Sequence, residues 1–113
     1  MKLVQKAVIK KGNKYLILFR SPNAAFFPEH WDFPGGKLEP EEEPFAGIER
    51  EVLEETGLKI KALAVVGIYE MLFHNIPHRF TLYSTKLFSK KITISHEHTN
   101  FKWATKDEIL KLK

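Results

Sequence analysis

The chain contains no cysteine. This absence excludes a disulfide framework, a thiolate metal site and a cysteine nucleophile, and it fits a reducing compartment. No apolar run approaches the roughly 20 residues that a membrane-spanning helix needs. The first residues, MKLVQKAVIKKG, also lack the apolar core of a signal peptide. We therefore expect a cytoplasmic protein with no membrane partner.

The sequence also lacks an internal repeat, a linker and a break in composition. With 113 residues, of which 43% are hydrophobic, it has the composition of a globular chain with one core. We predict a single domain over residues 1–113. The formal net charge is +4, while the acidic residues crowd into positions 39–55. A basic rim around an acidic site would attract polyphosphate anions.

A helix is predicted from Pro44 to Thr56. Proline suits the first turn of a helix, and Gly57 can take the left-handed conformation that ends one. At about 100° per residue, the side chains of Glu51, Glu54 and Glu55 share one sector of this helix.

These glutamates repel one another, and the helix dipole disfavours anions near the C-terminal end. A hard divalent cation of the magnesium type would remove the repulsion, and it prefers carboxylate oxygens. The alternative is a solvated acidic face with no ligand. Gly47, in the same sector, is expected to leave room for the loop at Gly35 and Gly36.

The spacing of nine residues resembles the Nudix box of the Nudix hydrolases without a gap or substitution. These residues are Gly36, Glu42, Arg50, Glu51, Val52, Glu54, Glu55, Gly57 and Leu58. The sequence Trp-Asp-Phe-Pro at 31–34 and the segment 97–108 are similar to the MutT-like branch of that family. The resemblance implies an α+β Nudix fold, an αβα sandwich with a mixed β-sheet and the Nudix loop-helix.

The resemblance also implies hydrolysis of a phosphoanhydride bond with Mg²⁺, for which Mn²⁺ can substitute. Phosphoanhydrides react slowly because their charge repels an attacking hydroxide, and divalent metals neutralise charge and acidify bound water. The three helix glutamates are the expected ligands. The family adds the carbonyl of Gly36 as a ligand. It also has a loop glutamate that joins the metal shell or activates water, and this catalytic residue matches Glu97; the alternative is a surface loop residue.

Further catalytic candidates surround these ligands. We expect Arg50 to point to a different side of the helix and to pair with Glu42, which holds the loop against the helix; the alternative is an exposed ion pair. Glu54 is our choice for the general base among the helix residues, although members of the family differ in this assignment. His96 and His98 flank Glu97 without a helical ligand spacing, and we treat them as peripheral.

The substrate-binding candidates are two arginines and one aromatic residue. Arg20 and Arg79 could each hold phosphates through bidentate contacts, and Phe27 could stack on a base. The alternatives are surface arginines and core aromatics. The other aromatic candidates are Phe26, Tyr69, Phe73 and Phe80.

We predict a hydrolase of a nucleoside diphosphate linked to a group X. A (d)NTP, oxidised forms included, would give the monophosphate and pyrophosphate. The alternatives within the family are a dinucleoside polyphosphate, ADP-ribose or a capped RNA end as substrate, and a non-catalytic module that binds nucleotide or RNA. A plain nucleic-acid-binding domain would need a contiguous basic stripe, whereas the lysines are scattered over several turns, so we expect a small-molecule partner and no nucleic acid.

The remaining elements follow from apolar patterns and turn residues. Residues 3–10 and 15–19 are predicted to form a hairpin around Gly12 and Asn13, and residues 21–30 a loop over the site. Extended segments are expected at 31–33, 60–69, 80–88 and 101–104, with a turn at 74–78. Thr105 and Glu108 predict a capping box that begins a last helix, which continues to the C-terminus.

Overall fold

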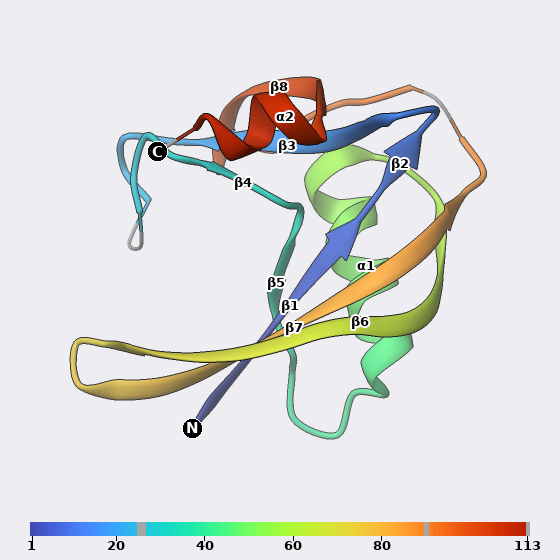
Figure 1. Cartoon of the computed structure of the whole chain (residues 1–113). Coiled ribbons are helices and arrows are strands. Elements are labelled where there is room, and N and C mark those ends of the chain that lie inside the picture. The colour runs from blue at the N-terminus through green and yellow to red at the C-terminus, as the bar shows by residue number, and fades with distance from the viewer. Residues whose placement is uncertain (25–26, 90, 113) are drawn as a thin grey trace.

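The computed structural model describes residues 1–24, 27–89 and 91–112 of the chain. Figure 1 shows its elements, whose order of strands, helix, strands and helix agrees with the prediction. The helices are α1 (Pro44–Thr56) and α2 (Lys106–Leu110). The strands are β1 (Lys2–Val8), β2 (Lys10–Lys11), β3 (Lys14–Arg20), β4 (Trp31–Asp32), β5 (Gly35–Lys37), β6 (Ile60–Phe73), β7 (Ile76–Leu87) and β8 (His98–Thr105).

In the described residues the strands form two sheets. The first, sheet A, has the order β5-β1-β7-β6, and its β1 is parallel to β7 but antiparallel to β5. The second, sheet B, has the order β2-β3-β4, with β8 also paired to β3. Sheet A is therefore mixed, which confirms the predicted α+β class.

The predicted N-terminal hairpin is only partly present. A tight turn at Gly12 joins β2 to the start of β3, but β1 does not continue that pairing. Instead, β1 runs along β7 in sheet A, with Val4 opposite Phe80. Residues 3–10 thus cross from one sheet to the other, and the buried Ile9 lies at the crossing.

Helix α1 has the predicted bounds because both of its ends are set by local chemistry. The side chain of Glu43 accepts the N–H of Ala46 at the start. At the end, Gly57 takes φ 72°, and its N–H donates to the carbonyl of Leu53. The apolar face of the helix packs into the core cluster formed by Ala7, Ile9, Leu16, Leu18, Ile48, Val52, Leu58, Ile60, Ala62 and Tyr83.

Gly47 plays a different role from the expected one. A Cβ atom at this position would meet Gln5 Oε1 and Leu38 Cδ1 at 2.8 Å each, and Glu42 Oε1 at 3.0 Å. The missing side chain therefore makes room for β1 and for the loop before α1, not for Gly35 and Gly36.

Strands β6 and β7 are longer than predicted. They extend to a two-residue turn at His74 and Asn75, both with positive φ, and form an arm that projects from the body of the molecule (Figure 1). Near the other end of the chain, β8 begins at His98, before the predicted strand. The capping box of Thr105 and Glu108 is present, but α2 ends at Leu110 and does not reach the C-terminus.

Candidate active site

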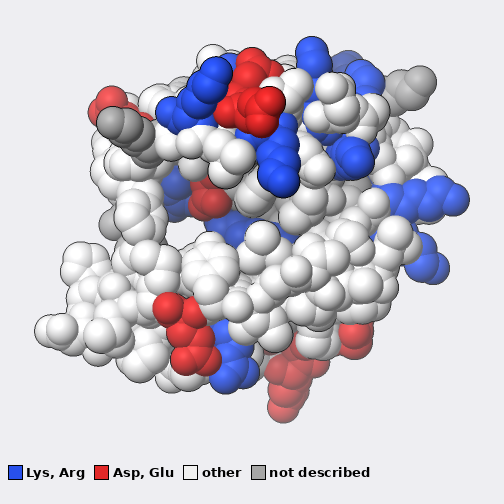
Figure 2. Space-filling model, viewed as in Figure 1, with Lys and Arg blue, Asp and Glu red and all other residues white. Residues whose placement is uncertain are grey.

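A pocket of about 700 Å³ lies between sheet A, the C-terminal half of α1, the end of β3 and the β6–β7 arm. Figure 2 shows it as a hollow with acidic and basic side chains inside, next to the mostly white, uncharged surface at the lower left. One end is lined by carboxylates and the other by aromatic rings, with cationic side chains between them. The part of the predicted loop at 21–30 that the structure describes lines its mouth through Ser21, Asn23, Ala24 and Phe27.

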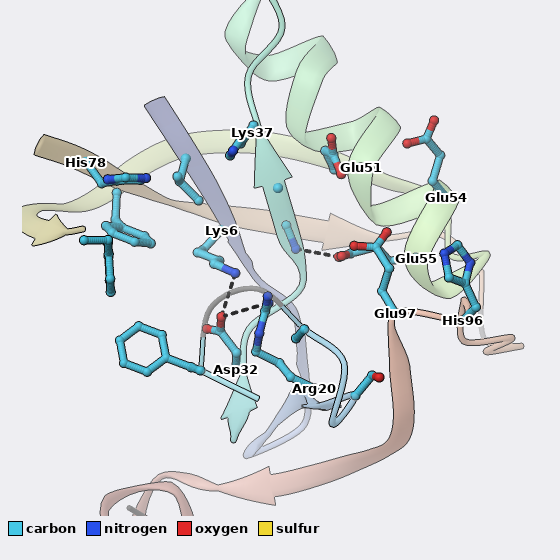
Figure 3. A pocket seen from close by; sticks show the side chains of 18 of the residues that line it. Lys6, Arg20, Asp32, Lys37, Glu51, Glu54, Glu55, His78, His96 and Glu97 are labelled. Atoms are coloured by element: carbon cyan, nitrogen blue, oxygen red, sulfur yellow. Dashed lines mark hydrogen bonds and ion pairs between the residues drawn. The ribbon is translucent and has the colours of Figure 1, made fainter. Parts of the chain in front are cut away.

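The carboxylate end brings together four predicted residues: Glu51, Glu54 and Glu55 from α1 and Glu97 from the loop before β8. Figure 3 shows the carboxylates of Glu55 and Glu97 beside each other. Glu55 is buried, and its Oε1 accepts the N–H of Gly35 at 2.7 Å. Burial, reinforced by the charges of Glu51 and Glu97, raises the pKa of Glu55 to about 8.

The loop at Gly36 closes against this end of the pocket. A Cβ atom at Gly36 would overlap the carboxylate of Glu51, so only glycine lets the backbone come this close. Burial also raises the pKa of Glu51 above its ordinary value. The contact places an acidic side chain next to the backbone segment whose carbonyl the family resemblance assigns as a ligand.

Arg50 forms the expected pair with Glu42 but does not point away from the other carboxylates. Its Nη1 donates to Glu54 Oε1 at 2.9 Å, and its Nη2 lies 3.1 Å from Glu51 Oε1. The hydrogen bonds from Arg50 lower the pKa of Glu42, and the same carboxylate raises the pKa of Arg50. One guanidinium thus joins the loop to two of the predicted ligands.

The loop that carries Glu97 is fixed by backbone hydrogen bonds. The N–H of Ser95 donates to the carbonyl of Glu55 at 2.9 Å, and the N–H of Ser21 donates to the carbonyl of Glu97 at 3.0 Å. His96 lines the pocket. His98 is buried, and burial together with the charge of Arg20 lowers its pKa to about 4. His96 therefore lies at the pocket, whereas His98 is buried and does not line it, and the expectation that neither is a metal ligand stays a prediction.

The aromatic end is built mainly by the arm. Phe73, His78 and Phe80 line the pocket there, together with Phe27. The rings of Phe27 and Phe73 meet edge to face with centroids 5.1 Å apart, and Tyr69 stacks on Phe80 at 4.8 Å. The predicted aromatic candidate Phe26 lies outside the described residues.

The two arginine candidates lie in different places. Arg20 lines the pocket, where its Nη1 lies 3.9 Å from Asp32 Oδ2. Arg79 instead pairs with Glu70, with its Nε donating to Oε2 at 3.0 Å. Because successive side chains of a strand point to opposite faces, Arg79 faces away from the pocket that His78 and Phe80 line. The structure does not bring Arg79 to the site.

Sequence reasoning missed one ion pair in this pocket, in which the lysine is buried and the aspartate is partly exposed. Lys6 on β1 is only 5% exposed, and its Nζ lies 2.7 Å from Asp32 Oδ2. Lys37 of the Nudix-like segment also lines the pocket. The alternation of β1 could have placed Lys6 on the face of Val4, but a lysine in a short strand is ordinarily taken as a surface residue.

The donor set of the carboxylate end fits a hard divalent cation such as Mg²⁺ or Mn²⁺. Four carboxylates and a glycine-lined backbone line this end of the pocket, and burial, reinforced by the neighbouring carboxylates, raises the pKa of Glu55. Within residues 1–24, 27–89 and 91–112, no three acidic or histidine side chains already converge closely enough to hold a metal ion. Binding would require some of these carboxylates to turn, while Arg50 occupies only one oxygen of Glu54, Oε1.

A family model described as the NUDIX domain matches residues 4–113. The chain belongs to the NUDIX domain family. The resemblance drawn from the Nudix box is thereby confirmed over nearly the whole chain and not only over the box. In the described part of this NUDIX domain, no helix is long and apolar enough to cross a membrane.

Relatives support the MutT-like branch. A MutT-like protein of Streptomyces ambofaciens is 30% identical over 106 residues, which cover 94% of this chain and 64% of that protein. The crystal structure of a MutT protein from Methanosarcina mazei Go1 superposes with a TM-score of 0.92 at 26% identity, over 99% of this chain and 82% of that chain. This likeness confirms the predicted Nudix fold.

A third relative matches only locally. Diphosphoinositol polyphosphate phosphohydrolase 2 of Mus musculus is 50% identical over 44 residues, or 39% of this chain and 25% of that protein. This NUDIX domain thus spans less than two thirds of the length of both curated relatives.

Proposed function

We propose that this NUDIX domain is a metal-dependent hydrolase of a nucleoside diphosphate linked to a group X, with (d)NTPs as its substrates. The products would be a nucleoside monophosphate and pyrophosphate. The observation that carries the proposal is the two-ended pocket, in which a carboxylate end and an aromatic end share one cavity. Oxygen ligands suit a metal bound to phosphates, and aromatic rings suit a base.

The side chains that line the pocket have different roles in this reaction. Arg20 and Lys37 line the cavity between its ends and neutralise part of the phosphate charge. Glu54 takes a proton from a water whose oxygen attacks one phosphorus of the P–O–P bridge. The bond from that phosphorus to the bridging oxygen breaks, and this oxygen leaves with the other product. Arg50 holds Glu54 at 2.9 Å and orients its carboxylate. Phe27 and Phe73 cover the base.

Glu51, Glu54, Glu55 and Glu97, with the carbonyl of Gly36, would hold the metal. A bound Mg²⁺ or Mn²⁺ supplies charge neutralisation on the phosphates and lowers the pKa of a coordinated water. Glu51 and Glu55 suit this role because burial has already raised their pKa values, so a cation relieves a cost that the metal-free site carries.

The test is product release from dNTPs, 8-oxo-dGTP, ADP-ribose and diadenosine polyphosphates, with Mg²⁺ or Mn²⁺. We expect turnover of dNTPs by the wild type, and a loss of at least about 100-fold in kcat for Glu51→Gln and Glu54→Gln. Glu41→Gln is the matched control, because Glu41 is an exposed glutamate of the preceding loop that does not line this pocket. Turnover that survives both pocket substitutions would refute the assignment.

The same panel tests two alternatives. The similarity to the diphosphoinositol polyphosphate phosphohydrolase is confined to 44 residues, so it gives little information on the substrate end of this pocket. Preferential cleavage of a diphosphoinositol polyphosphate added to the panel would replace the (d)NTP assignment. Metal-dependent nucleotide binding without cleavage would instead establish a non-catalytic binding module.

A further inference from the structure

Lys6 is a buried cation in the wall of the pocket. Its Nζ donates to Asp32 Oδ2 at 2.7 Å, and the other oxygen of that carboxylate accepts the N–H of Phe33 at 2.8 Å. Lys6 is 5% exposed. The ammonium is therefore held at a fixed point by a carboxylate that is itself fixed.

That point lies between the two ends of the pocket. Lys6 pairs across the sheet with Gly35, whose N–H donates to Glu55 at the carboxylate end. Two residues away on the same face of β1, Val4 pairs with Phe80 at the aromatic end. Figure 3 shows Lys6 and Asp32 between the helix glutamates and His78.

The hydrogen-bonding capacity of Lys6 exceeds what the described residues use. An ammonium has three N–H groups, and the described residues give Nζ one hydrogen-bond partner, Asp32. A lysine in this position could simply be a structural ion pair. The pair joins a buried lysine to a partly exposed aspartate. Such an ion pair contributes little to stability compared with apolar residues of similar volume, so a ligand explains a lysine here better than stability does.

We propose that Lys6 binds the phosphate that is attached directly to the nucleoside, through its non-bridging oxygens, and that Asp32 is its positioning residue. The inference rests on the proposed function: with the base on the aromatic end and the phosphate bridge at the carboxylate end, the first phosphate lies beside Lys6. Asp32 keeps the buried ammonium compensated while the pocket is empty.

The experiment compares mononucleotides with nucleosides in the absence of metal. Calorimetry measures the affinity of AMP, CMP, GMP and UMP, and of the four matching nucleosides, for wild type and Lys6→Met. We expect the mononucleotide that the wild type prefers to bind about 10- to 100-fold more weakly to Lys6→Met, the range for a lost charge-assisted hydrogen bond. The affinity for the matching nucleoside should not change.

Two further variants separate a ligand contact from a structural role. Lys14→Met removes one positive charge from an exposed site on β3 and should leave both affinities unchanged. Asp32→Asn keeps the cation of Lys6, so the preference for mononucleotide over nucleoside should persist. An equal loss of both affinities in Lys6→Met would show a structural role and overturn the inference, as would a wild type that binds no mononucleotide more tightly than its nucleoside.

If Lys6→Met does not fold, NMR of the wild type can still test whether Lys6 contacts the phosphate. The NMR signals of the Lys6 side chain should shift on addition of the mononucleotide and stay in place with the nucleoside, whereas no difference would refute the contact. A negative result in the hydrolysis panel can be distinguished from a negative result in the binding measurement. Phosphate-dependent binding through Lys6 without turnover would refute the hydrolase alone, and turnover with an unchanged mononucleotide affinity in Lys6→Met would refute the Lys6 contact alone.

Discussion

The guanidinium of Arg50 holds the carboxylate of Glu42 at both oxygens: Nε lies 2.6 Å from Oε2, and Nη2 lies 3.0 Å from Oε1. This two-point contact fixes the loop before α1 to the helix. Because the remaining nitrogen of Arg50 reaches Glu54 at 2.9 Å, the loop and the proposed general base share one anchor. The position of Glu54 thus depends on the contact between Arg50 and Glu42 in the preceding loop.

Replacing Arg50 by lysine should separate the effect of its positive charge from the effect of its two-point contact with Glu42. Lysine keeps the positive charge but cannot form the planar two-point contact. We expect Arg50→Lys to lower kcat about 10-fold or more, with a small change in the melting temperature because the ion pair is near the surface. Arg79→Lys breaks a similar pair, with Glu70 outside the pocket, and should leave kcat unchanged. Equal effects of the two substitutions on kcat would contradict a positioning role for Arg50.

Gly36→Ala should weaken metal binding without destabilising the fold. The added Cβ would overlap the carboxylate of Glu51, the mobile end of a flexible side chain that can move aside at little cost. We expect weaker Mn²⁺ binding and lower turnover, with a melting temperature close to that of the wild type.

Gly35→Ala is the contrasting variant. Its Cβ would overlap the backbone carbonyl of Gln5 in the adjacent strand, and its φ of 156° already disfavours a side chain. This substitution should lower the melting temperature strongly. Thermal melts and Mn²⁺ titrations of both variants decide the matter, and a Gly36→Ala protein with unchanged metal affinity would argue against Glu51 as a ligand.

The features that could be predicted from the sequence are those set by local chemistry. The bounds of α1 follow from Pro44 and Gly57, and the capping box from Thr105 with Glu108. The partner of β1 could not be predicted in the same way. Its pairing with β7 joins residues more than 70 positions apart, and an apolar strand pattern does not specify which strand lies beside it.

The same limit applies to the site. The glutamates of α1 could be placed because their spacing fixes one face of one helix. Lys6 could not, because its partner Asp32 lies 26 positions away and the charge gives no sign that the residue is buried. The side on which Arg79 lies could not be predicted for a related reason: it depends on the register of the arm, where alternate residues face opposite ways.

Phe73→Leu should weaken substrate binding without affecting the chemical step. Phe73 lines the aromatic end and contacts Phe27 at 5.1 Å between ring centroids. Stacking on a base contributes about 1–3 kcal/mol, so KM for the preferred dNTP should rise about 5- to 100-fold while kcat stays within about twofold. Leu72→Ala, an exposed neighbour on the opposite face, is the control. A lower kcat with unchanged KM would place Phe73 in a different role.

The capping box of α2 predicts a stability effect that depends on pH. Thr105 accepts the N–H of Glu108, and the side chain of Glu108 accepts the N–H of Thr105 at 2.9 Å. The hydrogen bond donated by the backbone N–H of Thr105 to the carboxylate lowers the pKa of Glu108 from 4.5. Because its pKa is lower in the folded state, Glu108 stabilises the fold above about pH 4.5. That contribution is lost as the pH falls through the folded-state pKa.

Urea unfolding between pH 7 and pH 3 tests this relation. We expect Thr105→Ala to lower the free energy of unfolding at pH 7 by about 0.5–2 kcal/mol, the usual range for the loss of a helix N-cap. Glu108→Gln should be less stable than the wild type at pH 7, and the difference should shrink as the pH approaches 3, where the wild-type carboxyl is also neutral. Asp107→Asn removes a neighbouring charge outside the capping box and serves as the control. A difference between Glu108→Gln and wild type that stays constant over this range would show that the ionised carboxylate does not stabilise α2.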